Sequence, residues 1–97
     1  MIKVAHRGYI NGNHPDNSRS ALLKAIELDY DMIEIDLRET KDKQIILHHD
    51  EDLMRLFKVD IKVKNLTLNQ LKELKFSNYV DLMLSFEDAL WHFLFNH

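Results

Sequence analysis

Two carboxylates set two residues apart are the first side chains in this sequence whose spacing could support chemistry. Glu34 and Asp36 lie in the run Ile33 to Leu37, where apolar and charged residues alternate. Side chains at i and i+2 share one face of a β-strand, so the two carboxylates are predicted to be neighbours. Paired carboxylates suit a hard divalent cation such as Mg²⁺ or Ca²⁺, which takes oxygen ligands, whereas a histidine-rich set would suggest zinc.

Histidines end two other apolar runs. His6 ends the first run of the chain, with Arg7 beside it, and His48 and His49 end a later run. An imidazole changes charge near neutral pH, so two of them could exchange the roles of general acid and general base. A guanidinium offers a planar fork for phosphate oxygens.

Each of these signals has an ordinary explanation when it is taken alone. Glu34 and Asp36 could be the solvated face of a half-buried strand, and the histidine pair could belong to a polar loop. The combination is more informative, because parallel strands collect their carboxyl-terminal tips at one edge. If the strand-like runs are parallel, the ionisable groups are predicted to converge there.

The elements that must position these groups are short strands alternating with helices. A first strand is predicted at Ile2 to Ala5, and a helix at Ser18 to Leu28 crosses over between parallel strands. Asp31 to Asp50 then holds two short strands joined by a polar turn at Thr40 to Lys43. Ile33, Ile35 and Leu37 are predicted to share one face of the first of these strands.

Three further helical segments and one extended piece are predicted after Asp50. They are a helical turn at Glu51 to Leu56, an extended piece at Val59 to Val63, and helices at Leu68 to Leu74 and Phe86 to Phe95. Capping boxes, Thr67 with Gln70 and Ser85 with Asp88, precede the last two helices. The final helix presents an apolar stripe that needs a partner surface, made of Phe86, Ala89, Leu90, Phe93 and Leu94 with Trp91 beside it.

Length and composition exclude several classes of protein. A chain of 97 residues has room for one small domain, which would bury roughly two thirds of its unfolded surface. The net charge of −3, with scattered basic residues, gives no footprint for nucleic acid. The absence of cysteine excludes a disulfide framework and a thiolate zinc site. No apolar run reaches the ~18 residues of a membrane span and no signal-peptide core precedes the first strand, so a cytoplasmic protein is expected.

Several short motifs, in order, resemble the N-terminal part of the glycerophosphodiester phosphodiesterase family. They are Ala5 to Gly8, Pro15 to Ser18, Ile33 to Asp36, His49-Asp50 with Leu53 and Arg55, Asn65 to Leu68, and Leu84 to Leu90. The resemblance covers essentially the whole chain. It implies an α/β fold, the first strands and helices of a TIM-type (β/α) barrel, and hydrolysis of small-molecule glycerophosphodiesters to glycerol 3-phosphate and an alcohol.

The resemblance also assigns roles to individual residues. His6 and His49 would be the acid and base pair, Arg7 would contact the substrate phosphate, and Asn17 would support the loop beside the site. Glu34 and Asp36 would be ligands of a divalent metal, Mg²⁺ or Ca²⁺.

The sequence departs from the family pattern in three ways. The family usually has Glu at the position of Asp16 and Pro at the position of Leu84. A complete barrel takes about 250 residues, so 1–97 is predicted to be a single truncated domain. The family's third metal ligand, a Glu on the next strand, lies beyond this chain. The alternatives are therefore an inactive remnant or interaction module of the same fold, a relative that acts on choline-headgroup lipids, and self-association through exposed apolar faces.

Overall fold

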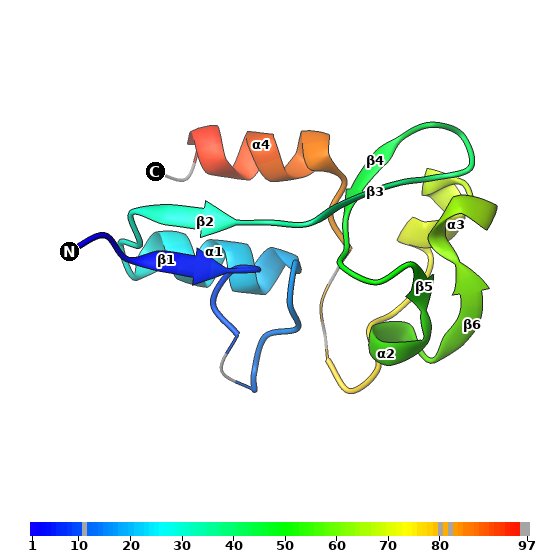
Figure 1. The fold of residues 1–97 in the computed structure, drawn as a ribbon, viewed down its shortest axis with the longest axis horizontal. Coiled ribbons are helices and arrows are strands. Elements are labelled where there is room, and N and C mark those ends of the chain that lie inside the picture. Colours follow the sequence, from blue (N-terminus) through cyan, green and yellow to red (C-terminus); the bar gives the residue numbers. More distant parts are fainter. Residues whose placement is uncertain (11, 80, 82, 96–97) are drawn as a thin grey trace.

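A parallel β-α-β unit forms the N-terminal half of the computed structural model (Figure 1). Strand β1 (Val4–His6) pairs in parallel with β2 (Met32–Glu34), and His6 lies opposite Glu34 in the register. Helix α1 (Arg19–Glu27) connects the two strands, and its N-cap Ser18 accepts a hydrogen bond from the amide of Ala21. The predicted crossover helix between parallel strands is therefore confirmed.

The structure describes all residues except 11, 80, 82 and 96–97, and it describes no side chains for 94 and 95. The contribution of Leu94 to the predicted apolar stripe consequently lies outside the described residues. Within the described part, no helix is both long enough and apolar enough to cross a membrane.

The next two strands form a hairpin rather than a parallel arrangement. Strand β3 (Leu37–Glu39) pairs antiparallel with β4 (Ile45–Leu47), and the amide of Thr40 donates to Gln44 at 2.8 Å across the turn. The condition under which the ionisable groups were predicted to converge, that the strand-like runs are parallel, therefore does not hold for β4. The polar turn is short, and a short turn can join only antiparallel neighbours. β4 thus returns toward the end of β2, and it brings the histidine pair back with it.

The predicted continuous strand from Ile33 to Leu37 is also interrupted. The chain leaves β2 after Glu34 and enters β3 at Leu37, whose side chain is exposed rather than buried beside Ile33 and Ile35. The amide of Asp36 donates to the side chain of Asn17 at 2.9 Å instead of to a neighbouring strand. The break places Asp36 at a corner where its neighbours come from a loop.

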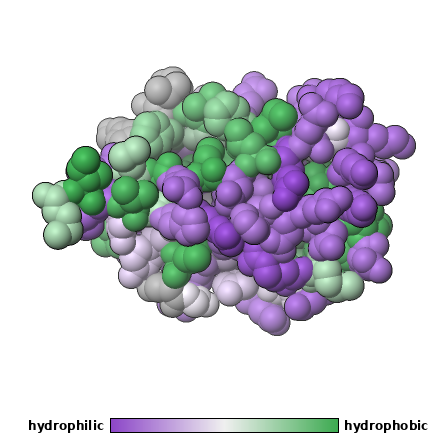
Figure 2. All heavy atoms as spheres, viewed as in Figure 1, coloured by the Kyte–Doolittle hydropathy of each residue, from purple (hydrophilic) through white to green (hydrophobic). Residues whose placement is uncertain are grey.

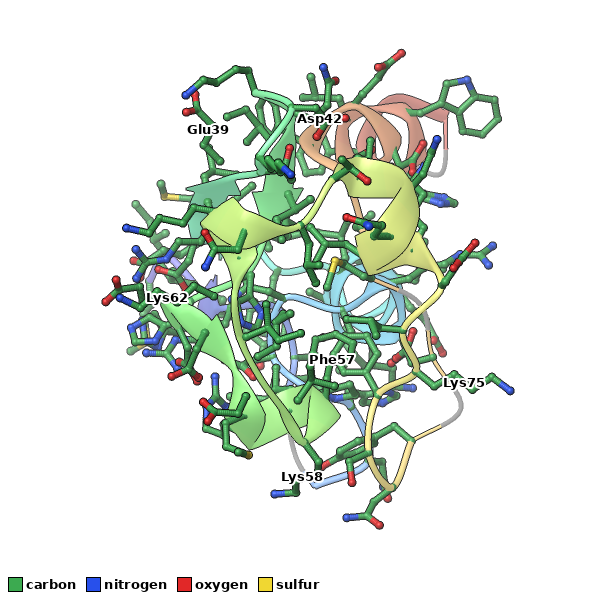
Figure 3. All side chains as sticks on the ribbon, turned by 90° about the vertical axis from the view of Figure 1, so that its right-hand side faces the viewer. Glu39, Asp42, Phe57, Lys58, Lys62 and Lys75 are labelled. Atoms are coloured by element: carbon green, nitrogen blue, oxygen red, sulfur yellow. The ribbon has the colours of Figure 1, made fainter. Side chains whose placement is uncertain are left out.

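The middle of the chain builds a second, separate layer of structure. It contains β5 (Asp52–Leu53), α2 (Met54–Phe57), β6 (Val59–Lys62), the 3₁₀ helix η1 (Val63–Asn65) and α3 (Leu68–Lys72). β5 and β6 are antiparallel, and the predicted capping box of Thr67 and Gln70 opens α3. Its core residues are Ile46, Leu53, Leu56, Phe57, Val63, Leu71, Phe76 and Met83. Phe57 points inward, whereas Lys58, Lys62 and Lys75 project outward (Figure 3).

Helix α4 (Phe86–Phe95) packs on the β-α-β unit and completes a smaller core. Ser85 accepts a hydrogen bond from the amide of Asp88 at 3.0 Å, as the predicted cap requires. The buried residues of this core are Leu22, Leu47, Leu84 and Ala89. Leu90 and Phe93 line an apolar groove of about 150 Å³ over β2. Figure 2 shows hydrophobic side chains gathered over this half and a mostly hydrophilic surface on the other.

Candidate active site

His6 and Glu34 face each other at the ends of the two parallel strands. The His6 Nε2 and Glu34 Oε1 atoms lie 2.8 Å apart, and both side chains are more than half exposed. Their closeness follows from the register, because residues at the same height of paired parallel strands point to the same side. A predicted acid or base thus lies beside a predicted metal ligand.

A loop after β1 holds Arg7 and Asn17 in left-handed backbone conformations. Their φ angles are 60° and 59°, and the amide of Asn17 donates to the carbonyl of Arg7 at 2.9 Å. Gly8 follows in the same region at φ 81°, and a Cβ there would lie 2.8 Å from the backbone of Ala21. Only glycine allows the loop to approach α1 this closely.

Asn17 clamps the second predicted metal ligand. Its side-chain oxygen accepts the amide of Asp36 at 2.9 Å, and its Nδ2 donates to Oδ2 of the same residue at 3.1 Å. Backbone and carboxylate of Asp36 are therefore fixed by one amide group. This contact supports the predicted role of Asn17 in holding the loop beside the site.

Arg7 lies between two carboxylates. Its Nη1 donates to Asp16 at 3.2 Å, and its Nε is 3.4 Å from Asp36 Oδ2. That Nε is buried and makes no hydrogen bond with any described residue. The Arg7 side chain is 24% exposed, so the part of its guanidinium that is open to solvent could bind a phosphate oxygen.

His49 and His48 have opposite environments although they are adjacent. His49 is exposed, its Nδ1 is 2.8 Å from Asp50 Oδ1, and its carbonyl accepts from the Arg38 guanidinium at 2.7 Å and 3.0 Å. His48 is buried, with its Nε2 2.8 Å from the carbonyl oxygen of Asp52. Burial lowers the pKa of His48, which favours its neutral form. Of the two, only His49 has a ring open to a substrate.

Arg55 joins two further carboxylates of the site, Asp16 and Asp50. It donates to Asp16 at 3.0 Å and 2.9 Å and to Asp50 at 2.8 Å and 3.2 Å. Burial raises the pKa of Asp16, but the hydrogen bonds and charges of Arg55 and Arg7 outweigh burial and hold that pKa below its usual value. The hydrogen bond from Arg55 likewise holds the pKa of Asp50 well below its usual range. Both carboxylates are therefore ionised at neutral pH.

Residues 6–93 match the model of the glycerophosphoryl diester phosphodiesterase family. The chain belongs to this family.

A glycerophosphodiester phosphodiesterase of Caldanaerobacter subterraneus is 39% identical over 73 residues, which are 75% of this chain and 30% of that protein. The solved glycerophosphodiester phosphodiesterase of Thermotoga maritima is 34% identical, with a TM-score of 0.81 over 94% of this chain and 38% of that one. A phosphodiesterase of Oleispira antarctica, solved with its product sn-glycerol-3-phosphate, is 25% identical, with a TM-score of 0.84 over 94% of this chain and 39% of that one.

The chain spans about a third of the length of these relatives. The predicted fold class, the first strands and helices of a TIM-type barrel, is confirmed for this member of the glycerophosphoryl diester phosphodiesterase family. The barrel architecture accounts for the groove over β2, because helices normally cover the outer face of each barrel strand.

The carboxylates of this chain provide part of a metal-binding site. Among the described residues, no three His, Cys, Asp or Glu side chains converge as a metal-binding group. Glu34 and Asp36 supply carboxylate oxygens from positions two residues apart, and Mg²⁺ is commonly held by one or two carboxylates together with substrate phosphates. Ca²⁺ takes six to eight oxygen ligands, which two carboxylates alone do not provide. The chemistry of the pair is thus closer to Mg²⁺.

Three residues of the site were missed by the analysis of sequence patterns. Arg38, Asp50 and Arg55 each contact a predicted functional residue or its neighbour, yet none was assigned a role. Asp50 carried a usable signal, since it directly follows His49 and a histidine often pairs with a carboxylate. Arg55 lies in one of the motifs that carry the family resemblance, but its partner Asp16 could not be read from the sequence because the contact spans 39 positions.

Proposed function

We propose that this chain carries part of the active site of a metal-dependent phosphodiesterase that hydrolyses glycerophosphodiesters to glycerol 3-phosphate and an alcohol. The observation that carries the proposal is the grouping of Arg7, Glu34 and Asp36 at the end of a parallel strand pair, with His6 in contact with Glu34. Membership of the family and the product-bound Oleispira structure support the choice of substrate.

His6 and His49 would share the proton transfers. One imidazole takes the proton of the attacking hydroxyl as the new P–O bond forms, and the other gives a proton to the alkoxide as the old P–O bond breaks. The nucleophile is water or the 2-hydroxyl of the glycerol. Arg7, whose guanidinium is partly exposed, would bind a non-bridging phosphate oxygen.

Glu34 and Asp36 are the residues that would hold the divalent metal, with Mg²⁺ or Ca²⁺ as the candidates. The ion would supply positive charge near the phosphate, where negative charge increases in the transition state. Asn17 would keep Asp36 in place for this role through its two hydrogen bonds.

The second candidate function is an inactive remnant or interaction module of the same fold. The apolar groove beside Leu90 and Phe93, both at least 40% exposed, favours it. Such a face drives association when no other segment covers it. In that case 1–97 would be a single truncated domain that binds a second copy rather than a substrate.

The deciding experiment measures release of glycerol 3-phosphate from glycerophosphocholine by the purified chain, with Mg²⁺, with Ca²⁺ and with EDTA. The enzyme hypothesis expects metal-dependent release that falls at least 100-fold in His49→Ala and Glu34→Gln. Asp60→Asn, which changes an exposed carboxylate on β6, is the matched control. No release with either metal would reject catalysis by this chain and leave the interaction module.

A further inference from the structure

Four charged side chains and one imidazole ring form a continuous hydrogen-bonded path across the site. The path runs from Arg7 to Asp16, on to Arg55, then to Asp50, and ends at the ring of His49. Its members come from the loop after β1, from the end of β4 and from α2. The path therefore links two residues of the proposed machinery that belong to different elements.

Arg55 is the centre of this path and donates four hydrogen bonds to two carboxylates. Two nitrogens donate to the two carboxylate oxygens of Asp16, at 3.0 Å and 2.9 Å. The Nε atom donates to Asp50 at 2.8 Å, and Nη2 also reaches that residue at 3.2 Å. Two bidentate contacts need the planar fork of arginine, and a lysine ammonium cannot reproduce them.

Asp16 is the buried member of the path. It is 5% exposed, and it accepts from both Arg55 and Arg7. A buried carboxylate is costly unless charges and hydrogen bonds compensate it, so the two guanidiniums are held in place by the need to satisfy this one group. Movement of Arg55 would consequently shift Asp16 and change its hydrogen bond with Arg7.

Asp50 contacts both Arg55 and His49, so the position of Arg55 affects the ring of His49 through this carboxylate. An ionised carboxylate can only accept a hydrogen bond, so the neutral ring of His49 must carry its proton on Nδ1, 2.8 Å from Asp50. The lone pair of Nε2 then remains open to accept a proton. The carbonyl of His49, held by Arg38, fixes the backbone from the other side.

We propose that Arg55 is a positioning residue that sets the ring tautomer of His49 through Asp50 and holds Arg7 through Asp16. Its relevance to catalysis rests on the proposed function. The tautomer itself does not, because it is a property of the free protein. The two claims can therefore be tested separately.

The first measurement is the tautomer of His49 by two-bond ¹H–¹⁵N correlation spectra of the labelled chain, above the pH at which the ring is protonated. The wild type is expected to show the Nδ1-protonated form. In Arg55→Gln, the ¹⁵N chemical shifts of both ring nitrogens are expected to indicate a mixture of the two tautomers. Arg55→Lys is expected to give shifts between those of the wild type and those of Arg55→Gln. Arg19→Gln, which removes an exposed arginine of α1 outside the path, is expected to match the wild type.

Asp50→Asn gives a second reading that leaves the contact between Arg55 and Asp16 in place. It is expected to produce the same mixture of tautomers, and it answers the question if Arg55→Gln does not fold. A wild-type ring protonated on Nε2 would overturn the proposal. So would a folded Arg55→Gln and Asp50→Asn pair that both keep the wild-type tautomer.

The second measurement applies when the wild type releases glycerol 3-phosphate. Arg55→Gln is then expected to lower kcat by about 100-fold, in keeping with the loss of a correctly oriented base, and Arg55→Lys to recover part of it. A wild type without activity would reject the proposed function but not the positioning. An active Arg55→Gln variant with wild-type kcat and tautomer would reject the positioning but not the function.

Discussion

Replacing the buried Asp16 by asparagine tests the electrostatic reading of the site most directly. The substitution keeps the size and shape of the side chain and removes its charge. In the folded chain Asp16 accepts hydrogen bonds from two arginines, at 2.9 Å and 3.0 Å from Arg55 and 3.2 Å from Arg7. An amide cannot accept on both of its heavy atoms, so at least one of these three hydrogen bonds is lost, and both guanidiniums lose the negative charge of their partner.

The expected loss in the free energy of unfolding depends on which acidic partners each arginine retains. Breaking a buried ion pair typically costs about 3–5 kcal/mol, because the other charge is left uncompensated. Arg55 retains Asp50 and is partly exposed, and Arg7 retains Asp36 at 3.4 Å. These remaining contacts reduce the loss, and we expect the free energy of unfolding to fall by about 2–3 kcal/mol.

Urea denaturation at pH 7, followed by circular dichroism, measures this change. With a urea m-value of about 1 kcal/mol/M for a small domain, the midpoint is expected to fall by roughly 2–3 M. Asp16→Glu keeps the charge and is expected to cost less, whereas Asp60→Asn on exposed β6 is expected to change stability by less than about 0.5 kcal/mol. If Asp16→Asn behaved like Asp60→Asn, the two arginines would not depend on this carboxylate.

Three further predictions concern the loop, the pH and the apolar groove. Gly8→Ala is expected to destabilise the chain by about 1–3 kcal/mol in the same urea assay, because the new Cβ would meet Ala21 and the backbone is left-handed. The free energy of unfolding is expected to fall as the pH drops below about 4. The folded pKa values of Asp16 and Asp50 lie below their unfolded values, so the unfolded chain then binds more protons. Urea midpoints at pH 7 and pH 3 measure this change, and equal midpoints would contradict the ion pairs. Phe93→Ser is expected to shift a self-associated chain toward monomer in sedimentation velocity, whereas an unchanged distribution would remove the groove as an interface.

Local patterns predicted most of the secondary structure. The crossover helix was predicted at Ser18 to Leu28 and extends from Arg19 to Glu27, with Ser18 as its cap. The capping box at Thr67 opens a helix as expected. These successes share a cause, because apolar periodicity and capping groups act between residues only a few positions apart. Such signals are complete within a short window of sequence.

The sequence left the direction of β4 open for a related reason. The alternation that identifies a strand does not state which neighbour it pairs with, and an antiparallel hairpin was possible as soon as the turn was short. The backbone beside His49 nevertheless contacts the corner that follows β2. β4 folds back toward the end of β2, where the amide of His48 donates to the carbonyl of Asp36 at 3.0 Å.

From the sequence alone come the family, the class of chemistry and the candidates His6, Arg7, Glu34 and Asp36, since each lies in a motif of adjacent residues. Tertiary structure decided which partners those candidates have. The contact between Arg55 and Asp16 joins residues far apart in the chain, and the different burial of His48 and His49 depends on the core that forms beneath one of them. Charge pairing and burial act through space, so neighbours in sequence can differ in environment while distant residues share a hydrogen bond.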